Sequence, residues 1–333
     1  MEPPEPSPSS AGPSHDFVPA ERSWQPWWLL PLLVVFTAAW FVPLLFQRQR
    51  EAVIVYAAQD QVYAEPILRE FTRQTGLRVR TVYDSEAVKT VGLANRLLAE
   101  QAHPQCDLYW GNEELRTRQL EARKVFRPAQ PWAAFGYRSR RLVINTNRLA
   151  LVDAPKSISE LTNQVWRGKI ALAYPMFGTT ATHFLALRQR WGDEPWKQWC
   201  QALRDNRPLL VDGNSLVVKL VGAGEAWLGL TDSDDITAGQ REGEPITQAA
   251  LTAETLLIPN TVGVVRGGPH PASAQKLFEY LQTRGVQEQL VAAGALEGLE
   301  LATVAGPMLR PDWATLLRDL DVAAESLKGI FLR

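Results

Sequence analysis

Three carboxylates within four positions are the feature of this sequence best suited to chemistry. Asp232, Asp234 and Asp235 lie in the stretch TDSDD (231–235), directly after the apolar run WLGL (227–230). Carboxylates at the end of a buried strand can hold a cation, bind an amine, or begin a helix, because a helix N-terminus attracts negative charge. They can also simply face water. Which of these roles applies depends on the strands and helices that surround TDSDD.

Other polar side chains stand where further strands should end or helices should begin. An ammonium group favours carboxylates and aromatic faces, whereas a phosphonate favours hydroxyls and N–H groups at helix starts. Each residue also has a role that needs no ligand, such as a helix cap for Ser85 or a core position for Trp110. The candidates are Asp60, Ser85 with Glu86, Trp110, Asn112, Glu113, Thr179, Thr180, Asn214 and Ser215.

The sequence gives little support for catalysis. Its four histidines are scattered, and neither a Gly-x-Ser-x-Gly elbow nor a His-Glu-x-x-His pair occurs. His183, beside the threonines, is the one histidine placed to reach a ligand. We therefore expect no enzyme and no cofactor.

Net charge and cysteine spacing argue against a nucleic-acid-binding protein and against a cysteine-ligated metal site. The net charge of −1 disfavours a nucleic-acid partner. Cys106 and Cys200 lack the spacing of metal ligands, which predicts two buried thiols, with a disulfide as the alternative.

The first 50 residues differ from the rest. Residues 1–26 are rich in proline and serine, which predicts a disordered tail. Residues 27–46 (WWLLPLLVVFTAAWFVPLLF) contain no charge and have the length of a transmembrane helix. The acidic leader favours an uncleaved anchor over a cleavable signal peptide. One extra arginine after the span leans weakly toward a cytoplasmic globular domain, so charge alone does not fix the topology.

From residue 52 onward, short apolar runs alternate with amphipathic stretches, which predicts an α/β fold with a largely parallel sheet. Strands are expected at 52–58, 140–147 and 256–266, and in CDLYWG, KIALAYP, RPLLVDG and AWLGLTD. The runs at 140–147 and 256–266 bracket an inserted unit. We therefore expect two lobes, residues 52–145 with 257–333 and residues 146–256.

Five segments in this order resemble the solute-binding proteins of bacterial ABC importers, in the two-lobed group of ferric-ion and 2-aminoethylphosphonate binders. They are VIVYAAQDQVYAEPILREFTRQTGLRVR, VYDSEAVKTVGLANRLLAE, CDLYWGNEELRTRQLEARKVF, LLIPNTVGVVRGGPHPASAQKLFEYL and the terminal IFLR. The resemblance implies the two-lobed periplasmic-binding-protein fold of type 2 topology. It also implies a monomer that closes on a small ligand and delivers it to a membrane permease.

Position by position, the resemblance changes the expected ligand. Where ferric binders carry a histidine, a glutamate and two tyrosines, this sequence has Asp60, Asn112 next to Glu113, and Asp234–Asp235. The phenolates are absent, although ferric iron accepts carboxylate oxygen. A metal, if bound, would use Asp60, Glu113, Asp234 and Asp235, whereas YDSEAVKT and TDSDD are closer to the phosphonate binders.

These observations predict a solute-binding protein anchored in the bacterial inner membrane by a single span, with its globular domain in the periplasm. Its ligand is expected to be an organophosphonate or a ferric species. The alternative is an anchored receptor of the same fold that senses its ligand and signals to a membrane partner.

Overall fold

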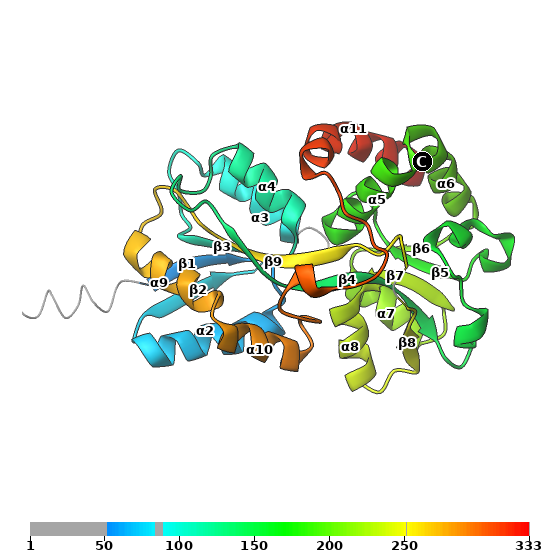
Figure 1. Cartoon of the computed structure of the whole chain (residues 1–333), viewed down its shortest axis with the longest axis horizontal. Helices are drawn as coiled ribbons and strands as arrows, with labels where there is room; N and C mark the ends of the chain where they lie inside the picture. The colour runs from blue at the N-terminus through cyan, green and yellow to red at the C-terminus, as the bar shows by residue number, and fades with distance from the viewer. Residues whose placement is uncertain (1–51, 84–88, 251, 333) are drawn as a thin grey trace, which may run out of the picture. The chain divides into compact units, whose positions relative to one another are not determined.

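The computed structural model describes residues 52–83, 89–250 and 252–332. Strands and helices alternate along these ranges, which confirms the expected α/β class (Figure 1). The strands are β1 (Ala52–Ala57), β2 (Arg78–Val82), β3 (Leu108–Gly111), β4 (Ala133–Asn145), β5 (Ile170–Ala173), β6 (Leu209–Val211), β7 (Leu228–Asp232), β8 (Ile246–Gln248) and β9 (Leu257–Val264). The helices are α2 (Gln61–Thr75), α3 (Lys89–Ala99), α4 (Glu114–Ala122), α5 (Gly178–Trp191), α6 (Asp193–Asp205), α7 (Asn214–Gly222), α8 (Ser233–Arg241), α9 (Pro271–Leu281), α10 (Arg284–Ala293) and α11 (Trp313–Phe331). Short 3-10 turns occur at η1 (Leu151–Asp153), η2 (Ile158–Thr162), η3 (Gln164–Trp166) and η4 (Leu301–Thr303).

Two groups of strands share the long strand β4. The first group has the order β2-β1-β3-β9-β4, in which β1 runs parallel to β2 and β3 while β9 runs antiparallel to β3 and β4. The second group has the order β4-β7-β5-β6, with β8 also paired to β4. Residues 133–139 of β4 pair with β9, and residues 140–145 pair with β7 and β8. The runs expected at 140–147 and 256–266 therefore correspond to the two strands that lie at the junction of the groups.

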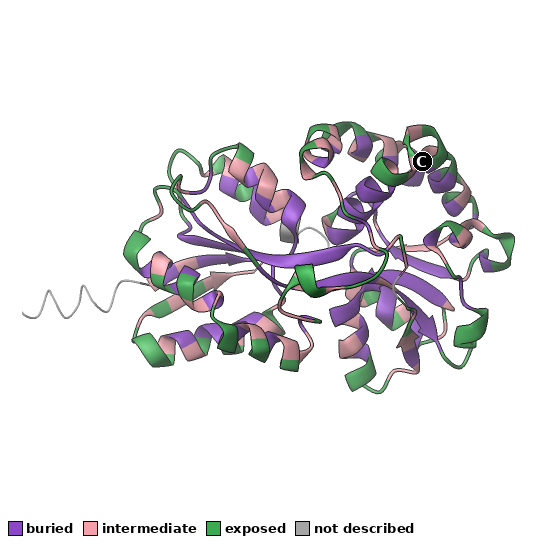
Figure 2. Ribbon diagram, viewed as in Figure 1, coloured by how far each residue is buried: buried purple, intermediate pink, exposed green. Residues whose placement is uncertain are grey.

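Helices cover both faces of the first group of strands. The apolar side chains of α2 recur at helical spacing, with Ala64, Ile67 and Phe71 buried, so this helix turns one face to the sheet. The helix ends at Gly76, which adopts the left-handed conformation (φ 71°) that closes many helices. Side chains of α2, α9 and α10 form the core on one face, and those of α3 and α4 form the core on the other. Figure 2 marks the buried positions of these helices in purple.

The second group of strands is likewise covered on both faces. Helices α5, α6 and α11 contribute to one core, and α7 and α8 contribute to the other. Phe331 of α11 packs edge-on against Phe184 of α5, with ring centroids 6.1 Å apart. The buried side chains of α11 thus lie in the same core as those of α5 and α6. This differs from the expectation that all of residues 257–333 belong to the first lobe.

The cysteines and the amino-terminal segment were the subject of two further expectations. Cys106 and Cys200 are buried and have free thiols, as expected. The tail at 1–26 and the apolar segment at 27–46 lie outside the described residues. Within the described ranges, no helix has both the length and the apolar character needed to cross a membrane.

Candidate functional site

A small cavity of about 50 Å³ lies where strands of both groups end. Asp60 follows β1, Asn112 follows β3, and Arg138 comes from β4, while the remaining wall belongs to the ends of β5, β6 and β7 and the helices that follow them. Ligands of open α/β sheets bind at such carboxyl ends of strands. The lining residues are Asp60, Asn112, Arg138, Ala173, Tyr174, Phe177, Gly178, Thr179, Thr180, Asp212, Gly213, Asn214, Asp232, Asp234 and Asp235.

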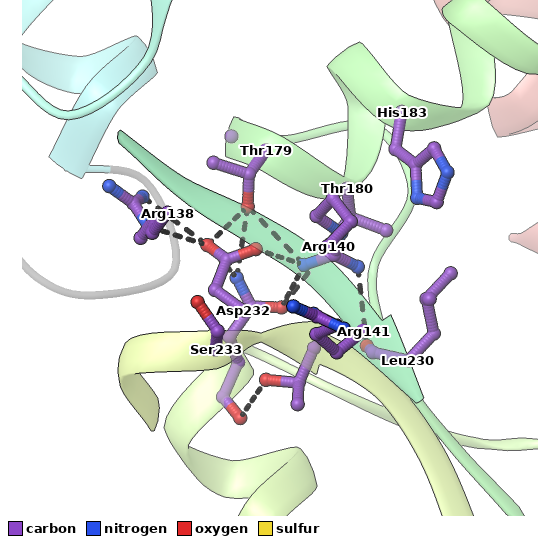
Figure 3. A network of polar contacts seen from close by, with 12 residues as sticks. Arg138, Arg140, Arg141, Thr179, Thr180, His183, Leu230, Asp232 and Ser233 are labelled. Atoms are coloured by element: carbon purple, nitrogen blue, oxygen red, sulfur yellow. Dashed lines mark hydrogen bonds and ion pairs between the residues drawn. The ribbon is translucent and has the colours of Figure 1, made fainter. Parts of the chain in front are cut away.

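A buried network of charges forms one side of the cavity (Figure 3). The Asp232 carboxylate accepts hydrogen bonds from Arg140 Nη1 at 2.7 Å and from Thr179 Oγ1 at 2.8 Å. Arg138 Nη2 lies 3.3 Å from the same carboxylate, and Asn214 Nδ2 lies 3.2 Å from it. All of these donors come from other elements of the chain, so Asp232 joins β4, α5 and α7 at one point.

The electrostatics of this network favour the charged forms. Burial opposes the ionisation of Asp232, but Arg140, Arg138 and the hydrogen bonds from Arg140 and Thr179 outweigh it and lower the pKa of the carboxyl group. Burial likewise opposes the charge of Arg138, yet the carboxylates of Asp234 and Asp232 raise its pKa above the ordinary value. Both groups therefore remain ionised near neutral pH.

Carboxylates outnumber guanidinium groups at the cavity. Five aspartates line it together with one arginine, Arg138. Side-chain oxygens of Asp232, Asp234 and Asp235 lie within 4.8 Å of one another, an arrangement that can hold a cation. Asp232 is already engaged by two guanidinium groups.

A phenol faces the same acids. Tyr63, in the first turn of α2, is partly buried, and burial together with the charges of Asp234, Asp235 and Asp60 raises the pKa of its phenol. The hydroxyl group therefore stays protonated at neutral pH and can donate a hydrogen bond.

Two helix starts supply a different kind of chemistry. The residues that precede α5 and α7, Phe177 and Gly213, make no side-chain cap, and neither helix has an acid in its first turn. Thr180 Oγ1 lies 3.4 Å from Asn214 Oδ1, which ties the two starts together. First-turn N–H groups without a side-chain cap attract an anion.

The structure brings eight of the predicted site residues to one cavity. They are Asp60, Asn112, Thr179, Thr180, Asn214, Asp232, Asp234 and Asp235. That they bind a ligand remains a prediction. Ser85 and Glu86 lie outside the described residues.

Two predicted residues, Trp110 and Glu113, have structural roles away from the cavity. Trp110 is fully buried in the core beside Phe135, with ring centroids 6.2 Å apart, so it is a packing residue. Glu113 caps α4, because its carboxylate accepts hydrogen bonds from the N–H groups of Leu115 and Arg116. Glu113 also accepts a hydrogen bond from Thr182 Oγ1, and it does not line the cavity. The assignment of Trp110 to ligand stacking and of Glu113 to a metal is thus corrected.

Ser215 and His183 were also expected near the ligand. Ser215 lies one residue inside α7 and is absent from the cavity wall. His183 is fully buried, and its Nε2 lies 2.7 Å from the carbonyl oxygen of Glu254. Neither side chain reaches the cavity.

Two buried arginines of this network, Arg138 and Arg140, were not among the predicted site residues. Arg138 and Arg140 are separated by two positions in YRSRRLVIN, so both point to the same side of β4. Two arginines on the same side of a central strand are a signal for a buried charged partner, and this signal could have been used.

Comparisons with known proteins place the chain among binding proteins. The model of the family described as bacterial extracellular solute-binding protein matches residues 53–295. The Fe(3+)-binding periplasmic protein of Serratia marcescens is 25% identical over 297 residues, which cover 81% of this chain and 84% of the relative. The major ferric iron-binding protein of Neisseria meningitidis is 23% identical over 269 residues, which cover 73% of this chain and 79% of the relative.

Solved structures share the fold at lower identity. Iron-bound HitA from Pseudomonas aeruginosa is similar with a TM-score of 0.71 and 20% identity, covering 84% of this chain and 99% of HitA. AfuA from Actinobacillus pleuropneumoniae with fructose-6-phosphate bound has a TM-score of 0.68 and 17% identity, covering 85% of this chain and 97% of AfuA. At such identities the likeness shows the fold alone.

Proposed function

The chain belongs to the family of bacterial extracellular solute-binding proteins, and we propose that it captures one small solute for an ABC importer. Its α/β fold is that of periplasmic binding proteins. Capture proceeds without turnover of the solute. A membrane permease receives the solute after release, and the binding protein acts as a monomer.

The observation that carries this proposal is the mixed chemistry of one cavity. The starts of α5 and α7 favour an anionic group, and the aspartates around Asp235 favour a cationic one. A solute with both groups satisfies both requirements. Two kinds fit: an aminoalkyl phosphonate such as 2-aminoethylphosphonate, and a ferric ion that arrives with an anion. Relatives named for ferric iron and a similar fold with a bound sugar phosphate are consistent with this class.

The size of the cavity supports capture by closure. A volume of about 50 Å³ accommodates only a few water molecules, since one water needs about 10–15 Å³. A larger solute therefore needs the wall to open and close again. We assign the two lobes to residues 52–145 with 257–333, apart from α11, and to residues 146–256. Strands β4 and β9 lie at their junction, where a hinge would act.

The location follows from the amino-terminal sequence. We propose that residues 27–46 form an uncleaved span in the inner membrane and that the globular domain lies in the periplasm. The length and the lack of charge of this segment support the span. The family assignment supports the periplasmic side, against the weak charge bias of the flanking arginines.

Calorimetry on the detergent-solubilised full chain tests the binding proposal. We expect one-to-one binding of 2-aminoethylphosphonate or of ferric citrate, weakened at least about tenfold by Asp235→Asn, because a lost charge-assisted hydrogen bond is worth about 1.5–3 kcal/mol. Glu242→Gln, at the other end of α8, is the matched control and should bind normally. Absence of heat with both solutes, and with phosphate esters, would contradict the proposed ligand class.

A further inference from the structure

The edge of the first sheet that lies opposite the cavity carries a second feature. Ala52, the first residue of β1, pairs with Arg78, the first residue of β2. Leu108 at the start of β3 pairs with Val264 at the end of β9. These four strand ends therefore lie along one edge, at the left of Figure 1. The cavity lies beyond the other end of β1 and β3, about 20 Å away for a six-residue strand.

Exposed basic side chains gather along this edge. Arg78 lies at the start of β2, and Arg266 follows β9. Arg123 and Lys124 lie in the turn after α4, which is fixed against the end of β9 by the hydrogen bond from Arg266 N to the carbonyl of Val125. Within the described ranges, none of these four cationic side chains makes an ion pair.

The acids near this edge already have partners. Glu100 accepts hydrogen bonds from Arg96 Nε and from the Tyr56 hydroxyl, both at 2.8 Å. Glu121 accepts a hydrogen bond from Trp132 Nε1 at 2.7 Å. Asp107 is fully buried and bonded to His270. The edge therefore presents a surplus of positive charge to solvent.

We propose that this basic edge, formed by Arg78, Arg123, Lys124 and Arg266, rests on the anionic lipid headgroups of the membrane that holds the chain. The inference depends on the proposed anchor. Five residues, 47–51, separate the apolar segment 27–46 from Ala52, and an extended chain of five residues spans at most about 18 Å. These five residues include Arg48, Arg50 and Glu51, so the connection carries a net charge of +1.

The short connection and the charge act together. Headgroup charges attract basic residues only within about one Debye length, roughly 10 Å at moderate salt. A connection of at most about 18 Å is shorter than two Debye lengths, so thermal motion brings the edge into this range, and the cations then favour contact. Because the cavity lies at the far end of the same strands, this contact directs the cavity away from the lipid and toward the periplasm.

Fluorescence quenching on the full chain in lipid nanodiscs tests the contact. Gln105 is exposed at the same edge, so Gln105→Cys accepts a thiol-reactive fluorophore. Burial raises the pKa of the thiols of Cys106 and Cys200, which leaves them unreactive. Lipids that carry a quencher on the headgroup then report proximity. We expect strong quenching with anionic lipid and weak quenching with zwitterionic lipid alone.

Charge reversal identifies the residues responsible. The triple variant Arg78→Glu, Lys124→Glu, Arg266→Glu should reduce quenching in anionic nanodiscs by about an order of magnitude. About 1 M NaCl, at which the Debye length falls to about 3 Å, should have the same effect on the unchanged protein.

A second triple variant is the matched control. Arg167→Glu, Arg207→Glu and Lys219→Glu reverse exposed charges of the other strand group, and they should leave quenching unchanged. Equal quenching in anionic and zwitterionic nanodiscs, or the same loss in both triple variants, would overturn the inference. Carbonate extraction tests the proposed membrane span separately. If carbonate removed the chain from vesicles, the span would be contradicted. Solute binding by calorimetry should be unchanged in both variants.

Discussion

Replacing Asp232 by asparagine should destabilise the protein strongly. The substitution keeps the size of the side chain and removes its charge. Arg140 is fully buried, and its 2.7 Å contact with Asp232 is its only ion pair in the part of the chain that the structure describes. Arg138 retains Asp234 at 3.3 Å. The loss therefore falls mainly on Arg140. Its charge would be left buried with neutral acceptors alone, namely Thr179 Oγ1, Asn214 Oδ1 and the Leu230 carbonyl.

The expected size follows from this geometry. Removing one partner of a buried ion pair typically costs about 3–5 kcal/mol. We expect about 3 kcal/mol, because three neutral acceptors remain for Arg140. Total stabilities of domains are about 5–15 kcal/mol, so the variant should still fold but unfold at clearly lower denaturant. The pKa of Asp232 is lowered in the folded state, so its stabilisation is present above about pH 4 and fades as the pH falls further.

Urea unfolding followed by tryptophan fluorescence measures the effect. Asp235→Asn, in the first turn of α8 and partly exposed, is the matched control and should cost less than about 1 kcal/mol. The double variant Asp232→Asn, Arg140→Gln should recover part of the loss, with a coupling of about 2 kcal/mol. A single-variant loss below about 1 kcal/mol, or strict additivity in the double variant, would refute the reasoning.

Two further predictions concern pH and packing. Burial, with the nearby charge of Arg140, lowers the pKa of His183 to about 3. The unfolded chain therefore binds a proton that the native protein does not, and stability should fall by roughly 1 kcal/mol per pH unit below about pH 6.5. His183→Gln should flatten this part of a urea-stability profile measured against pH, and an unchanged slope would contradict it. Gly229→Ala should cost about 1–3 kcal/mol, since its Cβ would lie 2.4 Å from Val217 Cγ1 and 3.0 Å from a backbone oxygen, whereas Gly285→Ala in open space on α10 should stabilise by about 0.5–1 kcal/mol in the same assay.

The part of the site that could be predicted is the part encoded locally. The apolar run WLGL followed by TDSDD predicts a strand whose carboxyl end carries acids. Strand β7 and the start of α8 have this form. The same local rule located Asp60 after β1 and Thr179 at the start of α5. Such residues are found from sequence because strand ends converge at one edge of the sheet.

The part that could not be predicted depends on distant partners or on the direction of a side chain. Arg140 meets Asp232 across 92 residues, and no local pattern marks that pairing. Trp110 was misplaced because every residue of β3 is buried, so its sequence lacks the alternation that tells one face from the other. Glu113 looked like a ligand at a strand end, but its oxygens are occupied by the N–H groups of the next helix.

The place of β9 has a consequence for how the chain is made. β9 lies between β3 and β4 in the sheet, although the residues of β5 to β8 separate it from both in the sequence. During synthesis and export, β3 and β4 therefore emerge long before the strand that joins them. Open strand edges are prone to pair wrongly with other chains, so the first sheet is exposed to aggregation until residue 264 has crossed the membrane. Chaperones that shield strand edges would protect the chain during this interval.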